Sequence, residues 1–237
     1  MPCGEELSGK GFYYSAHFHR IPQICANLYR RQVQTAKLDG ILKMRLILAS
    51  LSKARADLLC AAGYSFDQKP SGIDERPIQR GESPADYVQS LAEDKARKVA
   101  ADHPEAFTLA ADTVLVCGSH ITGKPSDMED AVRMLCKLTG ETHRLLTGIC
   151  IIPPSSNGTA KALTGVDVAF VTLRAMTEDR IRSHVQAAKP LEYAGAYALQ
   201  KQGVILIERM EGDPNTVIGL PMTLTERLLR QAGYVNP

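Results

Sequence analysis

The sequence predicts an α/β protein in which apolar strands alternate with amphipathic helices from Met44 onward. Three observations support this fold class. Short apolar runs have the length of strands, the segments between them have apolar residues at helical spacing, and Ser, Asp, Thr and Gly stand where helices would begin or end. Interleaved strands and helices are typical of a sheet covered by helices. The 237 residues, 44% of them hydrophobic, are enough to bury a core.

The first elements rest on clear local signals. Residues 45–49 (RLILA) form a short apolar run that predicts a buried strand, and a helix is expected over residues 53–62. Ser83 and Pro84 stand at the cap and first turn of a second helix, which we expect to run to about Ala101.

The alternation continues to the C-terminus. Residues 107–116 predict an apolar strand, and Asp127 can cap a helix over 129–138 that stops at Gly140. The remaining predicted elements are strands over 145–152, 166–173 and 204–207, a helix from the Thr177 cap to about Ala188, a turn over 212–215 and a helix over 223–231.

Composition argues against several classes of function. The net charge is only +2, and because residues 1–43 carry six basic and three acidic side chains, the rest holds about −1. We therefore expect no nucleic-acid partner. There is no apolar run of membrane-spanning length and no signal-peptide core, so we expect no membrane partner either. The six cysteines are scattered without a C-x-x-C pair, which favours free thiols in the cytoplasm.

Residues 1–43 differ from the rest, because they are rich in glycine and aromatic residues at first and then polar with basic doublets. We interpret them as an N-terminal extension that is poorly ordered, or as an over-long start before Met44. A mitochondrial-type presequence is the alternative, which three acidic residues and few serines disfavour. Residues 44–237 are expected to form the functional domain.

Two charged residues fall on positions that should be apolar. Asp112 lies within residues 107–116, and a carboxylate in a buried strand costs several kcal/mol unless a cation, donor or water shares its site. We favour a metal ligand or general base over an acid at a strand bend. Lys95 shares the apolar stripe of its helix with Leu91 and Val99, so it either extends to solvent or reaches an anion.

Three polar segments are candidates for binding an anion or a cation. Ser50, Ser52 and Arg55 stand between a strand and a helix, which suits a phosphate, although an ordinary serine cap with a solvated arginine has the same pattern. The adjacent Asp74 and Glu75 offer oxygen ligands to a hard cation, and Lys124 lies on a loop after the Asp112 strand; solvated side chains are the alternative for both.

In order along the chain, these segments resemble the Maf family of nucleotide pyrophosphatases, also called septum-formation proteins. The matching stretches are LILASLSKARADLL (46–59), GIDERP (72–77), ESPADYVQSLAEDKA (82–96), AADTVL (110–115), GKP (123–125), AGAYALQKQG (194–203) and EGDPNTVIGLPM (211–222). The resemblance covers about residues 44–235. It implies an elongated mixed sheet in two lobes with a central cleft, similar to inosine triphosphate pyrophosphatases, and hydrolysis of a nucleoside triphosphate to its monophosphate and pyrophosphate with Mg²⁺ or Mn²⁺.

The resemblance also implies roles for individual residues. Asp112 would be the catalytic base and, with Glu75 and Asp74, a metal ligand. The residues that would hold the phosphates are Ser50, Ser52, Arg55, Lys95 and Lys124, and those that would set specificity are Ala54, Thr113 and Gln200. Family members are commonly dimeric, which implies a possible homodimer.

Substrate preference is less clear from the resemblance. Ala54 stands where the family usually has an arginine. Thr113 and Gln200 match the branch that acts on dTTP and UTP, which we favour, whereas residues 212–222 resemble the branch that acts on 7-methyl-GTP. Further alternatives are a nucleotide-binding regulator of cell division without turnover and a phosphatase that releases orthophosphate.

Overall fold

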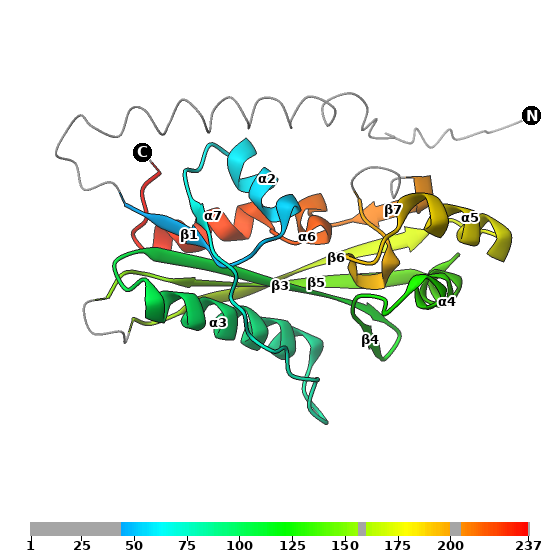
Figure 1. Ribbon diagram of the computed structural model, residues 1–237, viewed down its shortest axis with the longest axis horizontal. Coiled ribbons are helices and arrows are strands. Elements are labelled where there is room, and N and C mark those ends of the chain that lie inside the picture. Colours follow the sequence, from blue (N-terminus) through cyan, green and yellow to red (C-terminus); the bar gives the residue numbers. More distant parts are fainter. Residues whose placement is uncertain (1–43, 156–159, 200–204, 237) are drawn as a thin grey trace, which may run out of the picture. The chain divides into compact units, whose positions relative to one another are not determined.

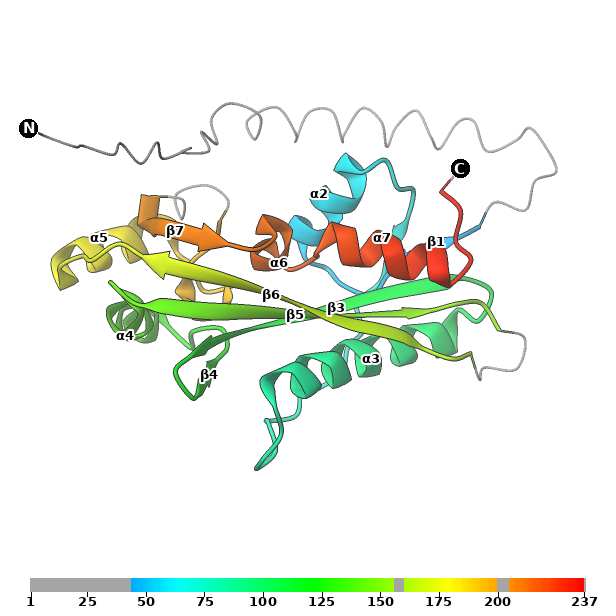
Figure 2. The same cartoon turned by 180° about the vertical axis from the view of Figure 1, so that it is seen from behind.

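The computed structural model describes residues 44–155, 160–199 and 205–236. In this part of the chain, seven strands form one mixed sheet with helices on both of its faces (Figure 1; Figure 2). The predicted α/β class is therefore confirmed. The predicted extension over residues 1–43 and the specificity candidate Gln200 lie outside the described residues. None of the helices in the described ranges is long and apolar enough to cross a membrane.

Three long antiparallel strands form the middle of the sheet, and shorter strands flank them. The long strands are β3 (Phe107–Cys117), β5 (Thr142–Ile152) and β6 (Leu163–Leu173); the short ones are β1 (Leu46–Leu48), β2 (Asp67–Gln68), β4 (His120–Thr122) and β7 (Ile207–Glu211). The strand order is β2-β1-β3-β5-β6-β7, with β4 paired to β3. Only β2–β1 and β1–β3 are parallel pairs between these strands.

One edge of β3 has an interruption, which we call the ladder gap. β1 pairs with β3 at Phe107–Leu109, and β4 pairs with the same edge of β3 at Leu115–Cys117. Among the described strands, residues 110–114 are therefore paired only with β5, on their other side. Asp112 and Thr113 lie in the middle of this gap, and their side chains point to opposite faces because side chains alternate along a strand.

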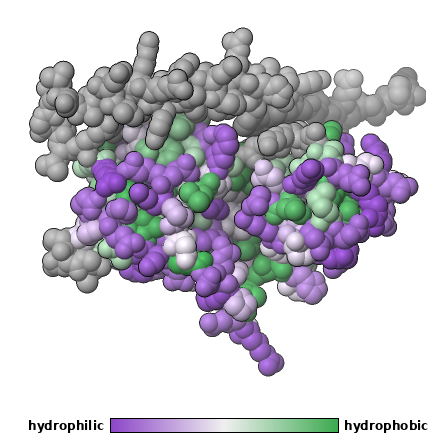
Figure 3. Space-filling model, in the orientation of Figure 1, coloured by the Kyte–Doolittle hydropathy of each residue, from purple (hydrophilic) through white to green (hydrophobic). Residues whose placement is uncertain are grey.

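The helices cover the two faces unequally. α3 (Pro84–Asp102) lies along one face, whereas α2 (Lys53–Ala61), α6 (Pro214–Ile218) and α7 (Met222–Gln231) lie on the other (Figure 1; Figure 2). α4 (Met128–Leu138) and α5 (Glu178–Ala188) pack together near the far end of the long strands, with the short turn η1 (Ala194–Ala196) against α4. The face seen in Figure 3 is mostly hydrophilic, as expected where helices turn their apolar sides to the sheet.

The hydrophobic core is divided across the middle of the sheet. On the α7 face, Leu109 and Ile149 belong to one cluster and Leu115 and Leu145 to another. On the α3 face, two further clusters lie on either side of Asp112. A polar row therefore crosses the sheet between two apolar halves of the core.

Several local predictions are confirmed. Ser83 caps α3 by accepting a hydrogen bond from the Asp86 N–H at 3.1 Å, and Asp127 caps α4 by accepting one from the Asp130 N–H at 2.7 Å. Thr177 stands at the N-cap of α5 as predicted, although its side chain makes no capping hydrogen bond.

Other predictions of elements were wrong. The strand expected at 204–207 is β7 at Ile207–Glu211, whose partly exposed polar sequence gives little apolar signal. Residues 212–215 are not a simple turn, because Asp213 caps α6 by accepting from the Asn215 N–H at 2.9 Å. The two- and three-residue strands β2 and β4 were not predicted, since so short a run has no readable period.

Candidate active site

A buried ion pair occupies the middle of β3. Asp112 is 6% exposed, and its Oδ1 accepts a hydrogen bond from Lys95 Nζ at 2.5 Å. The same ammonium donates to Glu75 Oε1 at 2.7 Å. The cost of burying Asp112 is thus offset by a cation, as predicted. The alternative of an acid at a strand bend is wrong, because Asp112 pairs in register with Gly148 inside a regular ladder.

Helix α3 brings Lys95 to this position through close contact with the sheet. Lys95 and Val88 are seven residues apart and both buried, so they share the face of α3 that meets the sheet. A Cβ atom at Gly148 would lie 2.5 Å from the Val88 carbonyl oxygen. Glycine at this position lets the helix backbone rest directly on β5 beside Asp112. Sequence reasoning missed Gly148, although an isolated glycine within a strand is a known sign of close backbone approach.

The loop that carries Glu75 is fastened to α3 by its next residue, Arg76. The Arg76 guanidinium donates to both carboxylate oxygens of Glu82 at 2.8 and 2.5 Å and to Ser90 Oγ at 2.6 Å. It also lies 5.2 Å from the centre of the Tyr87 ring, whose hydroxyl donates to the Arg76 carbonyl at 2.7 Å. These residues were not predicted as part of the site, yet they fix the backbone beside Glu75.

The electrostatics of Glu75 connect the separate candidates. Burial acts to raise the pKa of the Glu75 carboxyl, but the nearby cations outweigh it and the pKa is lowered. Those cations are Lys95, which donates a hydrogen bond, and the more distant Lys124 and Arg55. Three predicted phosphate-binding residues therefore lie close enough to one carboxylate to stabilise its charge.

The predicted phosphate segment comes together at the start of α2. Ser52 is the N-cap and its Oγ accepts from the Arg55 N–H at 3.4 Å. Ser50 Oγ accepts from the Ser52 N–H at 3.2 Å and from Arg55 Nη1 at 3.3 Å. Arg55 Nε donates to the Gly219 carbonyl at 2.9 Å and Nη2 to Thr113 Oγ1 at 3.3 Å. The alternative of a fully solvated arginine is therefore wrong.

Burial also affects the charge state of Arg55. Desolvation lowers the pKa of its guanidinium, and the carboxylates of Asp112 and Glu75 act in the opposite direction. Arg55 contacts Thr113 on one face of β3, while Lys95 contacts Asp112 on the other face. The ladder gap thus has a cation on each side.

Behind Thr113 lies a chain of hydroxyl groups that sequence reasoning missed. Thr113 Oγ1 is 2.9 Å from Thr147 Oγ1, which donates to the Thr216 carbonyl at 2.8 Å. The Thr216 hydroxyl in turn donates to the Asp167 carboxylate. Thr147 and Thr216 are completely buried. A threonine within the apolar segment LLTGIC was the available signal.

The remaining candidates are placed less firmly. Lys124 is exposed and its Nζ is 3.4 Å from Glu192 Oε2. Its loop is attached to η1, because the Gly195 N–H donates to the Gly123 carbonyl at 3.0 Å. Ala54 is half-buried in the first turn of α2, directly before Arg55.

The predicted metal ligands are only partly brought together. Within the described residues, no group of three or more His, Cys, Asp or Glu side chains is arranged to hold a metal ion. Glu75 and Asp112 share Lys95, whereas the exposed Asp74 has no hydrogen bond or ion pair with a described residue. Glu75 and Asp112 thus meet at Lys95, while Asp74, next to Glu75 in sequence, stays a predicted ligand.

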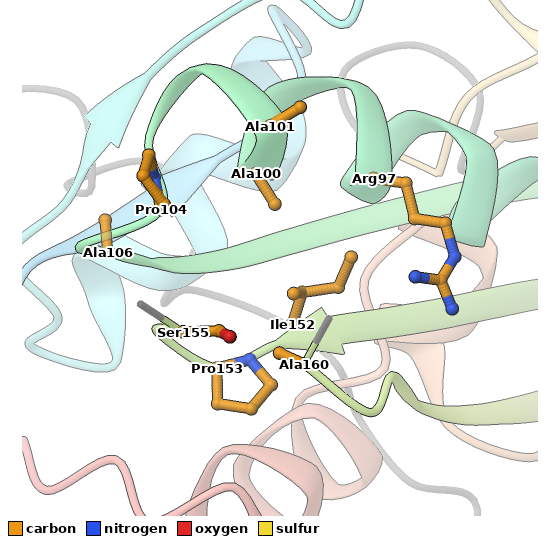
Figure 4. Close-up of a pocket in the computed structure, with 9 residues that line it drawn as sticks. All are labelled: Arg97, Ala100, Ala101, Pro104, Ala106, Ile152, Pro153, Ser155 and Ala160. Carbon is orange, nitrogen blue, oxygen red and sulfur yellow. The ribbon is translucent and has the colours of Figure 1, made fainter. Parts of the chain in front are cut away.

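A pocket elsewhere on the molecule is a poor candidate for a nucleotide site. Its volume of about 190 Å³ is below the range typical of ligand sites. It lies between the C-terminal part of α3 and the end of β5 (Figure 4), and its lining residues are Arg97, Ala100, Ala101, Pro104, Ala106, Ile152, Pro153, Ser155 and Ala160. No predicted site residue is among them.

Comparison with known proteins agrees with the residue pattern. Residues 45–232 match the family model described as "Maf-like protein". The chain is 41% identical over 195 residues to a dTTP/UTP pyrophosphatase of Anaeromyxobacter dehalogenans, covering 81% of this chain and 96% of that protein. It is 40% identical over 191 residues to a dTTP/UTP pyrophosphatase of Geobacter sulfurreducens, covering 81% and 98%.

A solved structure of a nucleoside-triphosphatase (dITP/XTP pyrophosphatase) from Mycobacterium abscessus is also similar, with a TM-score of 0.38 and 10% identity over 80% of this chain and 95% of that one. That likeness is too distant to support an argument. The family model and the two relatives, by contrast, match most of the chain in sequence. The chain belongs to the Maf family.

Proposed function

We propose that this protein hydrolyses dTTP and UTP to the nucleoside monophosphate and pyrophosphate. The observation that carries the proposal is the Lys95 ammonium shared by Asp112 and Glu75 beside the ladder gap. It places a potential base, a second carboxylate and a movable cation within one small volume. Relatives named dTTP/UTP pyrophosphatase, about 40% identical over nearly their whole length, support the substrate class.

The cations of the site would bind the phosphate chain. A triphosphate carries roughly four negative charges, which must be balanced when it enters the site. We assign this role to Arg55, Lys95 and Lys124, assisted by the hydroxyls of Ser50 and Ser52. Arg55 is already oriented by three acceptors, so little side-chain entropy is lost when it binds phosphate.

Asp112 would act as the general base. Lys95 balances the charge of Asp112, and the negative charge of a bound triphosphate would attract that ammonium away from the carboxylate. Asp112 Oδ1 would then accept a proton from the water that attacks the α-phosphorus. The bond from the α-phosphorus to the bridging oxygen breaks, and pyrophosphate leaves.

A divalent cation fits the donors present. Mg²⁺ and Mn²⁺ prefer oxygen ligands, and Mg²⁺ is often bound by one or two carboxylates together with substrate phosphates. Glu75 and Asp112 would hold the ion, with Asp74, next to Glu75 in sequence, as a third ligand. When bound, the ion would stabilise negative charge on the phosphate oxygens and the leaving group. Thr113 and Gln200 are the residues that we assign to base recognition, with Ala54 affecting the choice of base.

We further propose that residues 44–237 are the catalytic domain and that the protein acts as a homodimer in the cytoplasm. In support of a reducing compartment, Cys117, Cys136 and Cys150 form no disulfide within the described part of the chain. Light scattering would determine the oligomeric state. Activity of a chain that begins at Met44, compared with the full chain, would test the domain assignment.

The central experiment is a panel of nucleotides with identification of the products. The full chain is incubated with dTTP, UTP, dCTP, GTP and 7-methyl-GTP, with Mg²⁺, with Mn²⁺ and with EDTA. We expect dTMP and pyrophosphate from dTTP in the presence of metal. Binding without products would support the regulator, orthophosphate would support the phosphatase, and faster cleavage of 7-methyl-GTP would support the other family branch.

A further inference from the structure

The direction of each hydrogen bond behind Thr113 follows from the groups involved. The Thr216 carbonyl can only accept, so Thr147 uses its single hydroxyl hydrogen in the 2.8 Å bond to that oxygen. Thr147 can then only accept at the 2.9 Å contact with Thr113. The Thr113 hydroxyl must therefore be the donor in that contact.

The same reasoning limits what Thr113 can offer to a ligand. A threonine hydroxyl has one hydrogen and two lone pairs. The hydrogen is directed to Thr147, and one lone pair accepts from Arg55 Nη2 at 3.3 Å. One lone pair remains. Thr113 is half-buried in the ladder gap, and its hydroxyl lies on the face of β3 that carries Arg55, opposite the face of Asp112 and Lys95.

Thr216, at the end of the row of hydrogen-bonded threonines, fixes the directions of these hydrogen bonds. Thr216 is buried in α6, its hydroxyl donates to Asp167 on β6, and its N–H donates to the Asp213 carbonyl at 3.0 Å. The Thr216 carbonyl therefore has a fixed position. Thr147 is also completely buried, in the middle of β5, so its hydroxyl cannot turn to a water molecule instead.

We infer that Thr147 is a specificity-determining residue, because it makes Thr113 a pure acceptor and so selects a nucleobase with an N–H at that point. This inference rests on the proposed function and on Thr113 facing the base. Uracil and thymine carry a hydrogen on N3, whereas cytosine has a lone pair there. An acceptor facing cytosine N3 would place two lone pairs against each other, with no hydrogen bond possible. Thr147 acts through Thr113 and needs no contact with the substrate.

The test compares kcat/KM for dTTP and dCTP in three proteins with Mg²⁺, measured by release of pyrophosphate. In Thr147→Val the shape is kept but the acceptor for Thr113 is lost, so the Thr113 hydrogen can turn to the base. We expect the kcat/KM for dTTP divided by that for dCTP to fall about tenfold or more. Thr147→Ser keeps a hydroxyl and should restore the ratio towards that of the wild type.

The outcomes separate this inference from the proposed function. A purely structural defect would lower both values of kcat/KM together and leave their ratio unchanged, which would overturn the role of Thr147. If Thr147→Val cleaves dTTP and its ratio of kcat/KM values equals that of the wild type, the role of Thr147 is overturned but the proposed function stands. Failure of the wild type to release pyrophosphate from either nucleotide would instead overturn the proposed function. If Thr147→Val does not fold, Thr147→Ala removes the same hydroxyl with less bulk and is subject to the same criteria.

Discussion

Gly148 lies directly opposite Asp112 in the β3–β5 ladder, at the point where the backbone of α3 touches the sheet. Gly148 and Asp112 thus both contribute to the same contact between α3 and the sheet. The missing side chain on β5 lets α3 approach, and the approach brings Lys95 within 2.5 Å of the Asp112 carboxylate. The packing of the helix and the charge balance of the site cannot be changed independently.

A methyl group at Gly148 should therefore affect both stability and activity. It would meet the Val88 carbonyl at 2.5 Å, and backbone cannot move aside cheaply. We expect Gly148→Ala to lower the free energy of unfolding by about 1–3 kcal/mol, as measured in urea, and to reduce turnover. Gly165→Ala is the control, because the three atoms nearest to its methyl all belong to the flexible Leu224 side chain, the first at 3.0 Å. Equal losses in the two variants would contradict this account.

Removal of the Asp112 charge should abolish most turnover while the fold survives. In Asp112→Asn the amide oxygen can still accept from Lys95, but the side chain no longer takes up a proton. We expect kcat to fall by about 10²-fold or more, with KM for dTTP changed only a few-fold. Asp57→Asn, in an exposed pair with Lys53, is the matched control and should retain full activity. Undiminished turnover in Asp112→Asn would rule out a base at this position.

The support of Arg55 by the Gly219 carbonyl can be tested with two glycines. A Cβ at Gly219 would lie 3.2 Å from Thr113 Oγ1 and 3.3 Å from Arg55 Nε, whereas one at Gly233 would meet nothing within 4 Å. Both glycines have positive φ, so alanine at either should cost about 1 kcal/mol of stability. Only Gly219→Ala should raise KM for dTTP. If both variants, or neither, change KM, Gly219 does not position Arg55.

The attachment of the Glu75 loop predicts a change in metal affinity. Glu82→Gln weakens the two-pronged contact with Arg76, so Glu75 should be held less firmly next to Asp112. We expect Mn²⁺ binding, followed by electron paramagnetic resonance without nucleotide, to weaken several-fold. Glu93→Gln removes the exposed Arg97 pair on the same helix and serves as the control. Unchanged Mn²⁺ affinity in Glu82→Gln would show that the loop does not need this contact.

His143 predicts how stability depends on pH. Burial lowers its pKa to about 4, below the ordinary value of 6.5, so the folded state favours the neutral ring. The contribution of the neutral ring to the free energy of unfolding is complete above about pH 6.5. As the pH falls towards 4, the free energy of unfolding decreases by up to about 1.4 kcal/mol per pH unit. His143→Gln should be less stable at neutral pH but should lose less stability on acidification.

Tyr197→Phe is the control for this prediction. It removes the hydroxyl that lies 2.6 Å from His143 Nε2 but leaves the ring buried. The steep dependence on pH should therefore persist in that variant. Thermal unfolding between pH 7 and 4 measures all three proteins, and equal slopes for the wild type and His143→Gln would show that His143 is not responsible.

Local rules predicted the elements well where burial and capping agree. Asp112 and Lys95 stood out because each placed a charge on an apolar face, and the structure pairs them with each other. The helix caps at Ser83 and Asp127 were readable because a short polar side chain satisfies backbone N–H groups close to it in sequence.

The contacts that join distant segments could not be predicted in this way. Thr147 meets Thr216 across 69 positions of sequence, and Arg55 meets Gly219 across 164. Neither the period of a strand nor the cap of a helix indicates which buried hydroxyl will face which carbonyl. The role of Gly148 depends on the path of α3, which is set by tertiary packing.

The ladder gap has a consequence for association as well as for chemistry. A bare sheet edge normally invites a strand from another molecule, and proteins avoid this hazard in various ways. Here the unpaired stretch spans only residues 110–114, with β1 and β4 closing it at either end. A foreign polypeptide would find too short a run for a stable ladder. The stretch of β3 that carries the buried Asp112 is thereby protected from edge-to-edge association by its own shortness.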